Sequence, residues 1–116
     1  MIASVKGSIS YIGHGYVVVD VGGVGYKVHT GLGRELELGK VGALVLLWTH
    51  QVVREDSLDL YGFVTQTELN FFEMLIKISG IGPKGALGIM GVAPLPALKQ
   101  AIGSGDISYL TKVSGI

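Results

Sequence analysis

Residues 80–85 have the types and spacing of a turn that binds an anion. Two glycines separated by one residue permit a backbone bend too sharp for residues with a Cβ atom. Pro83 suits the first position of a helix, so the N–H groups of Lys84 and Gly85 would lie unpaired at the helix start, beside the Lys84 ammonium. These groups predict a phosphate site, with Ile81 pointing inward. Its candidate residues are Gly80, Ile81, Gly82, Lys84 and Gly85. The alternative is a glycine-rich turn that only joins two packed helices.

Two adjacent carboxylates form a second candidate site. Residues 54–57, with the sequence REDS, lie between two strand-like runs, which predicts a turn. Glu55 and Asp56 would repel an approaching phosphate, so they are excluded as DNA anchors. The alternative is an exposed turn that simply carries solvated acids.

The sequence lacks the patterns of other common active sites. It has no cysteine, which excludes disulfides, thiol nucleophiles and thiolate metal sites. Its histidines, at positions 14, 29 and 50, are not spaced as metal ligands on one helix face. The glycines at 22, 23 and 25 lack the lysine and hydroxyl residue of a phosphate loop. We therefore expect no catalysis, metal or cofactor in this chain, and ATP hydrolysis only in another protein.

Composition limits the size and the partners of the protein. The chain has 116 residues, which suits one domain or two small ones. Nine Lys and Arg balance nine Asp and Glu, so any contact with DNA must be local. Charged residues are 16% and hydrophobic residues 48%, which indicates that some apolar surface meets a partner. Because we find neither a secretory signal nor a membrane-spanning run, we expect a cytoplasmic protein.

The first 63 residues read as short β-strands separated by glycines. Enrichment in Val, Ile, Tyr and Trp predicts strands over residues 2–11, 16–21, 24–29, 43–53 and 58–63. Gly22 and Gly23 predict a tight hairpin between the second and third strands. This pattern favours a five-stranded Greek-key barrel of the OB-fold type. The fourth run is apolar on both faces, as in a central strand or a subunit interface.

After residue 63 the hydrophobic period becomes helical. Thr65 and Glu68 have the spacing of a capping box, and the apolar residues that follow predict a helix over 66–78. Further short helices are predicted over residues 83–90, 94–102 and 106–112. We therefore expect an OB-fold domain with an acidic hairpin at 1–63, followed by a small all-α domain at 64–116.

A seven-residue unit occurs twice in the second half. Residues 75–81 (LIKISGI) recur as residues 110–116 (LTKVSGI), with five of the seven positions identical. Two copies suggest a pseudo-symmetric pair of turns, the second containing Ser114 and Gly115. The chain ends before the second copy reaches positions equivalent to Gly82 and Lys84, so we expect the second hairpin to be incomplete.

The first copy and the residues after it resemble a known DNA-binding motif. Residues 75–86 (LIKISGIGPKGA) resemble the helix-hairpin-helix motif. That resemblance implies binding to DNA backbone phosphates without reading of bases, and it adds Ser114 and Gly115 to the DNA-binding residues. Because the motif occurs in glycosylases, ligases, polymerases and repair nucleases, it implies DNA but no particular reaction.

Three further segments precede the turn at Gly80 in the order found in the RuvA family. They are residues 21–29 (VGGVGYKVH), 49–56 (THQVVRED) and 60–63 (LYGF). Over essentially all 116 residues the chain resembles this family of bacterial Holliday-junction-binding proteins. The resemblance implies an OB-fold domain, a domain with two helix-hairpin-helix motifs, and a C-terminal domain that engages the RuvB ATPase. We expect that last domain to be missing from this chain.

The family resemblance also implies a function. It describes a non-catalytic scaffold that holds four-way junction DNA open for branch migration driven by a RuvB-type ATPase, in recombination, DNA repair and the SOS response. A RuvC-type resolvase is implied as a further partner. Glu55 and Asp56 fall on the family's acidic pin, at the centre of a homotetramer or octamer, where negative charge would keep DNA strands apart.

Two other classes of function stay open. Another DNA-repair protein could use the helix-hairpin-helix as a non-specific clamp, and purified protein would then cleave, ligate or excise. A module that binds no nucleic acid agrees with the zero net charge. It predicts no junction binding even at low salt.

Overall fold

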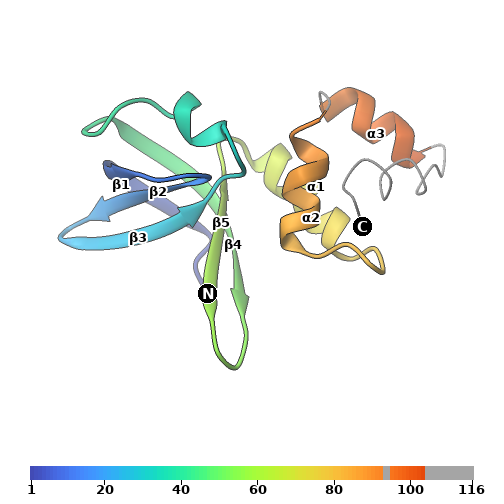
Figure 1. Cartoon of the computed structure of the whole chain (residues 1–116), viewed down its shortest axis with the longest axis horizontal. Coiled ribbons are helices and arrows are strands. Elements are labelled where there is room, and N and C mark those ends of the chain that lie inside the picture. Colours follow the sequence, from blue (N-terminus) through green and yellow to red (C-terminus); the bar gives the residue numbers. More distant parts are fainter. Residues whose placement is uncertain (93–94, 104–116) are drawn as a thin grey trace. The chain divides into compact units, whose positions relative to one another are not determined.

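The computed structural model describes residues 1–92 and 95–103 of the chain (Figure 1). The chain divides into two compact units, one of Met1–Leu69 and a second that begins at Asn70. The first unit is a β-barrel and the second is helical. The assignment of separate roles to residues 1–63 and 64–116 stays a prediction.

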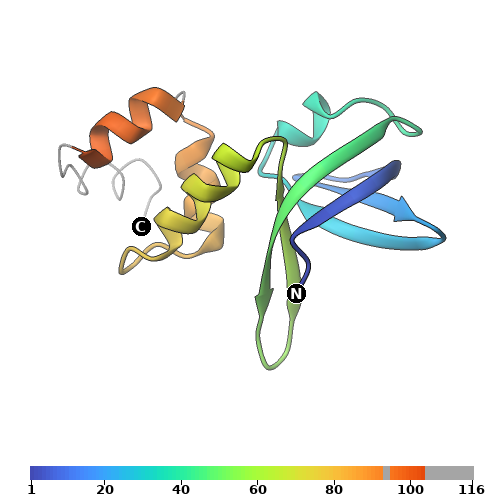
Figure 2. The same cartoon turned by 180° about the vertical axis from the view of Figure 1, so that it is seen from behind.

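Five strands close into a barrel in the order β1-β2-β3-β5-β4, which confirms the predicted fold class. Neighbouring strands are antiparallel except β3 and β5, which are parallel. Figure 2 shows β1 and β4 side by side, where the sheet closes on itself. The strands are β1 (Ser4–Ile12), β2 (Tyr16–Val21), β3 (Val24–His29), β4 (Leu44–Val53) and β5 (Leu58–Phe63).

Side chains that alternate along the strands fill the barrel. Val17 and Val19 of β2 and Val28 of β3 are completely buried, as the two-residue period of a strand requires. Gly62 of β5 lies against this core, because a Cβ atom there would be 2.3 Å from Cγ1 of Val28. The parallel pairing of β3 with β5 therefore needs a glycine at this position.

The predicted hairpin between β2 and β3 is confirmed. Val21 pairs with Val24, so Gly22 and Gly23 form a two-residue loop. Their φ angles of 60° and 95° lie in the left-handed region that glycine adopts without strain.

A short 3-10 helix, η1 (Arg34–Glu37), lies between β3 and β4 and was not predicted. Its Glu35 side chain is only 3% exposed. Glu35 Oε2 accepts a hydrogen bond from the N–H of Gly15 at 2.6 Å, which fastens η1 to the β1–β2 loop. Glu35 Oε1 is buried and has no hydrogen-bond partner among the described residues.

Three helices follow the barrel: α1 (Gln66–Ile76), α2 (Pro83–Met90) and α3 (Leu95–Gly103). The predicted bounds of α2 are confirmed. α1 ends two residues before its predicted end, because the N–H groups of Lys77 and Ile78 bond to carbonyls only three residues back. The helix predicted over 106–112 lies outside the described residues.

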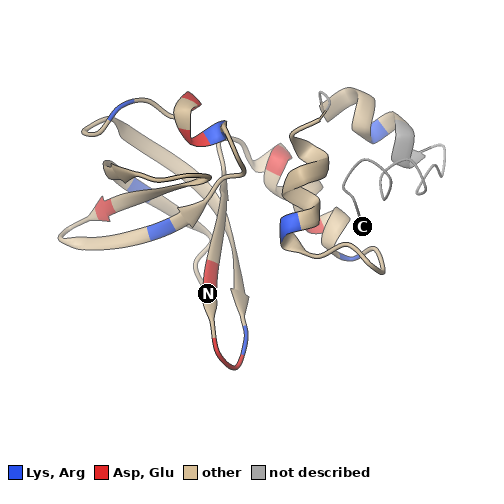
Figure 3. Cartoon of the chain, in the orientation of Figure 1, with Lys and Arg blue, Asp and Glu red and all other residues tan. Residues whose placement is uncertain are grey.

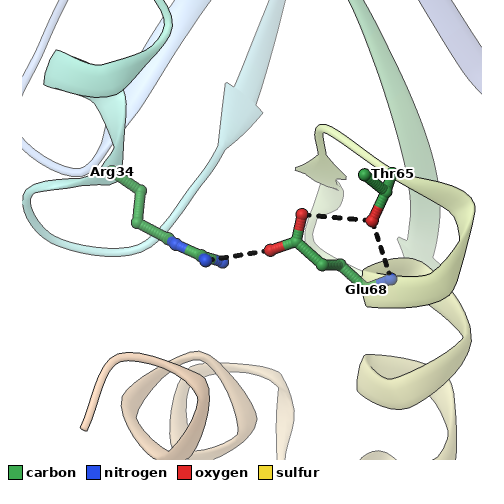
Figure 4. Close-up of polar contacts among 3 residues, drawn as sticks. All are labelled: Arg34, Thr65 and Glu68. Atoms are coloured by element: carbon green, nitrogen blue, oxygen red, sulfur yellow. Dashed lines mark hydrogen bonds and ion pairs between the residues drawn. The ribbon is translucent and has the colours of Figure 1, made fainter. Parts of the chain in front are cut away.

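The predicted pairing of Thr65 with Glu68 at the start of α1 is confirmed (Figure 4). The N–H of Glu68 donates to Thr65 Oγ1 at 3.1 Å, and the Thr65 hydroxyl donates to Glu68 Oε1 at 3.2 Å. The hydroxyl thus satisfies one of the free N–H groups of the first helical turn.

Buried apolar side chains hold the helical unit. They come from α1, the turn after it, α2 and α3, and they are Phe71, Phe72, Leu75, Ile81, Ala86, Ile89, Met90 and Leu98. Their burial explains how α2 persists with glycines at 85 and 88, since packing compensates for the low helix propensity of glycine. Among the helices in the described residues, none has the length and apolar character needed to cross a bilayer.

Candidate nucleic-acid interface

The turn between α1 and α2 is shaped by Gly80 and Ile81. Gly80 has a φ of 89°, in the left-handed region where a Cβ atom is strained. The N–H of Ile81 donates to the carbonyl of Ile78 at 3.1 Å, and the Ile81 side chain is only 4% exposed. The prediction that Ile81 points inward is therefore confirmed, and it anchors the turn in the helical core.

Gly82 is exposed and does not need to be glycine for the fold. Its φ of −90° and ψ of 179° describe extended backbone that other residues adopt. A Cβ atom built on Gly82 would meet no atom within 4 Å. The prediction that both glycines are needed for the bend is therefore wrong for Gly82. The space beside it is open to an outside ligand.

The first turn of α2 presents free backbone donors. Pro83 occupies the first position and has no N–H, and the first helical bond runs from the N–H of Ala86 to the carbonyl of Gly82 at 2.9 Å. The N–H groups of Lys84 and Gly85 have no hydrogen-bond acceptor among the described residues. Gly82 supplies no side-chain cap, and Lys84 is exposed. Two free amide donors and the positive end of the helix dipole thus lie at the start of α2, and the same turn carries the ammonium of Lys84.

A further cation precedes the turn. Lys77 is exposed directly after α1, three residues before Gly80. Lys77 is not among the residues that the sequence analysis assigns to the site, although it is an identical position of the repeated LxKxSGI pattern. Ser114 and Gly115, the candidates from the second copy, lie outside the described residues.

Glu55 and Asp56 lie exposed at the end of the β4–β5 hairpin. The N–H of Arg54 donates to the carbonyl of Ser57 at 2.8 Å and closes the turn. Neither carboxylate forms an ion pair within the part of the chain that the structure describes. Figure 3 shows this acidic tip where the hairpin extends past the other strands. The predicted turn is confirmed, and it presents unneutralised negative charge.

Charged groups also surround Tyr61 on β5, which is 5% exposed. Burial raises the pKa of the Tyr61 hydroxyl, and the negative charge of Asp59 raises it further. The positive charge of Arg54 opposes both effects and lowers this pKa. Asp59 on β5 and Arg54, the first residue after β4, therefore act on the Tyr61 hydroxyl in opposite directions.

The barrel also contains a small cavity of about 80 Å³. Its lining includes Thr30, Arg34, Leu47, Phe63 and Glu68. Ligand pockets usually measure roughly 300–1,000 Å³, so this cavity does not suit a nucleotide. No cluster of three or more acidic or histidine side chains is placed to hold a metal ion within residues 1–92 and 95–103.

The fold and the turn define a class of protein in which an OB-fold barrel precedes a helix-hairpin-helix-like unit with free amide donors. Comparison with known proteins agrees with that class. The family described as RuvA N terminal domain matches residues 1–62, which include β1 to β4, most of β5 and the acidic turn. This chain belongs to the RuvA family.

Relatives match the helical part as well. The chain is 39% identical over all its 116 residues to the Holliday junction branch migration complex subunit RuvA of Acetivibrio thermocellus, covering 57% of that protein. It is 40% identical over its whole length to the subunits of the same name from Caldanaerobacter subterraneus and Symbiobacterium thermophilum, covering 62% and 57% of them. The chain thus spans about three-fifths of the length of these relatives.

Proposed function

We propose that this chain is a non-catalytic subunit that binds four-way junction DNA in a branch migration complex. The observation that carries the proposal is the turn at Gly80–Gly85, where free N–H groups of Lys84 and Gly85 stand beside an open Gly82 and an exposed ammonium. The names of the relatives, which are branch migration complex subunits, support it.

The chemistry of this turn suits the DNA backbone. A phosphate oxygen accepts hydrogen bonds from amides at a helix start, and the Lys84 charge strengthens the attraction. Neither group distinguishes one base from another, so the turn grips any duplex arm. The open side of Gly82 lets the sugar-phosphate chain approach the amides.

In this proposal the turn attracts DNA phosphates, whereas the acidic tip repels them. Several copies of the chain, a homotetramer or an octamer of two such rings, surround the point where four arms meet. Glu55 and Asp56 then stand at the crossover, where their charge repels phosphates. Their repulsion holds the exchanging strands apart, while the turns of the helical units hold the arms.

The proposal assigns the energy source to a partner. A RuvB-type ATPase hydrolyses ATP and drives migration, and a RuvC-type resolvase acts on the same junction. The relatives are longer than this chain, which leaves room in them for regions that this chain does not match. Such a complex acts in the cytoplasm, in recombination, DNA repair and the SOS response.

A gel-shift titration with a four-way junction and a linear duplex of equal total length tests the proposal. We expect the junction to bind far more tightly, with an affinity that falls steeply as salt rises, because phosphate contacts release counterions. Equal affinity for both DNAs contradicts junction recognition and favours a non-specific clamp. Absence of binding at low salt contradicts any role for the turn in holding DNA.

A further inference from the structure

The acidic tip is carried by a part of the hairpin that has little support from the barrel. β5 pairs with β3 only through Leu60 and Tyr61, and the strand pairing of β4 with β1 ends at Trp48. Hydrogen bonds from Thr49 to Ala3 and Ile2, and from the N–H of Ile2 to Gln51 Oε1, extend the support of β4 as far as Gln51. Beyond those positions the two strands pair with each other, as Val52 does with Asp59 and Val53 with Leu58. The direction of the tip therefore depends on these contacts of β4 and on the side chains that hold β5 at the same level.

His29 and Asp59 lie at this point. His29 is the last residue of β3, and its Nε2 is 3.6 Å from Oδ1 of Asp59. Asp59 lies on β5, directly before the two residues that pair with β3. The His29 ring is flanked by two other rings, with centroids 6.3 Å from Tyr16 and 5.3 Å from Tyr61. Packing between β2 and β5 thus holds the imidazole in place to reach the hairpin.

The strength of this contact depends on the charge of the imidazole. Protonated His29 forms an ion pair with the Asp59 carboxylate, whereas neutral His29 offers a weaker contact at the same distance. The two side chains are 30% and 36% exposed, so solvent screens the ion pair only in part. Imidazoles in general titrate near 6.5, within the range of ordinary buffers.

Several other groups lie around His29. Tyr16 of β2 and Tyr61 of β5 contribute rings, and His50 of β4 pairs with Tyr61 on the far side of β5. Lys27, on β3 itself, lies over the Tyr16 ring with its Nζ 4.3 Å from the centroid. The positive charge of Arg54 acts on Tyr61. Within this group Asp59 carries the negative charge that attracts a protonated His29.

We propose that His29 is a positioning residue for Glu55 and Asp56, which holds the hairpin through Asp59 more firmly when its imidazole is protonated. The importance of a fixed tip for function rests on the proposed function, because the direction of the tip matters only if the tip meets the crossover. The structural effect of His29 on the hairpin does not rest on the proposed function and is measured without DNA.

The test is hydrogen exchange at the Arg54 amide, whose bond to Ser57 closes the turn, in the full chain between pH 5.5 and pH 8. Protection factors correct for the intrinsic pH dependence of exchange. An ion pair of this exposure predicts protection about two- to five-fold higher at the acidic end in the wild type. His29→Phe keeps a ring between Tyr16 and Tyr61 and should show low protection that no longer changes with pH. Asp59→Asn should behave in the same way.

His14→Phe is the matched control, because His14 is an exposed loop histidine and should keep the wild-type pH dependence. A pH-independent wild type, or the same pH dependence in His29→Phe, overturns the proposal. Junction binding and strand exchange are then compared at both pH values. Absence of a pH effect on the wild-type tip refutes the role of His29. Junction binding and strand exchange that do not change when Glu55 and Asp56 are replaced refute the proposed function instead.

Discussion

Nη2 of Arg34 lies 2.9 Å from Oε2 of Glu68, so the short helix η1 is tied to the first turn of α1 (Figure 4). The same carboxylate accepts a hydrogen bond from the Thr65 hydroxyl through its other oxygen. The Glu68 side chain thus contacts both the residue that caps the start of α1 and Arg34, which lies 34 positions earlier in the sequence.

The Arg34–Glu68 ion pair should contribute measurably to stability. In a double-mutant cycle of Arg34→Ala and Glu68→Ala, measured by urea unfolding, we expect a coupling free energy of about 0.5–1 kcal/mol at low salt. It should shrink in high salt because ions screen the pair. Glu37→Ala is the control, since Glu37 is an exposed acid of the same short helix. A coupling of zero at low salt would show that the pair is not formed in solution.

Lys84→Ala should weaken junction binding several-fold and lower the slope of log affinity against log salt by about 1. The reason is that one phosphate contact and its released counterion are lost, and this loss should be equal for arms of any sequence. Titrations of two junctions with different arms, at four salt concentrations, measure both quantities. Lys40→Ala, an exposed lysine of the barrel, should change neither.

The two glycines of the turn should separate folding from binding. Gly80→Ala places a Cβ in the left-handed region and should lower the free energy of unfolding by about 1–2 kcal/mol. Gly82→Ala meets no protein atom and should change stability by no more than about 0.5 kcal/mol. It should nevertheless weaken junction binding, because the methyl group stands where the phosphate approaches. Unfolding curves and junction titrations of the same two variants decide the matter, and unaltered junction affinity of Gly82→Ala would refute the assigned site.

Removing the charges of the acidic tip should not weaken binding. In the double variant Glu55→Gln and Asp56→Asn the shape is kept while two negative charges near the DNA are lost, so junction affinity should stay equal or increase. The rate of strand exchange should change, because the strands at the crossover are no longer repelled. Fluorescence exchange assays on a mobile junction measure that rate, with Glu37→Gln as the control acid. A clear loss of affinity would contradict the role proposed for the tip.

Much of the barrel could be predicted because its strands follow simple alternation. The bounds of β2, β3 and β5 agree with the residue patterns. In β2 and β3 valines alternate toward the core, and Gly22 and Gly23 separate the two runs. β1 begins two residues after its predicted start and ends one residue after its predicted end, and its pairing with β2 shifts register between Ile9 and Tyr11. Such an irregularity leaves no mark on composition.

Other features depend on contacts that sequence patterns do not reveal. The short helix η1 forms around Glu35, and a buried acid is the residue least expected in a core. Its hydrogen bond to the N–H of Gly15 spans 20 positions. The pattern predicts that the bend needs Gly82, yet its backbone is extended and a Cβ atom built on it meets no atom within 4 Å. The ring contacts of His29 likewise exist only once β2, β3 and β5 are neighbours.

The projecting hairpin of β4 and β5 has one more consequence. A closed barrel offers no unpaired strand edge, but the outer part of this hairpin has two of them, with exposed Val53 and Leu58 beside the turn. Such edges invite pairing with a strand of another molecule, which leads to aggregation. Charges at the end of a hairpin discourage that pairing, so we expect Glu55 and Asp56 to help to keep free molecules apart before any ligand arrives.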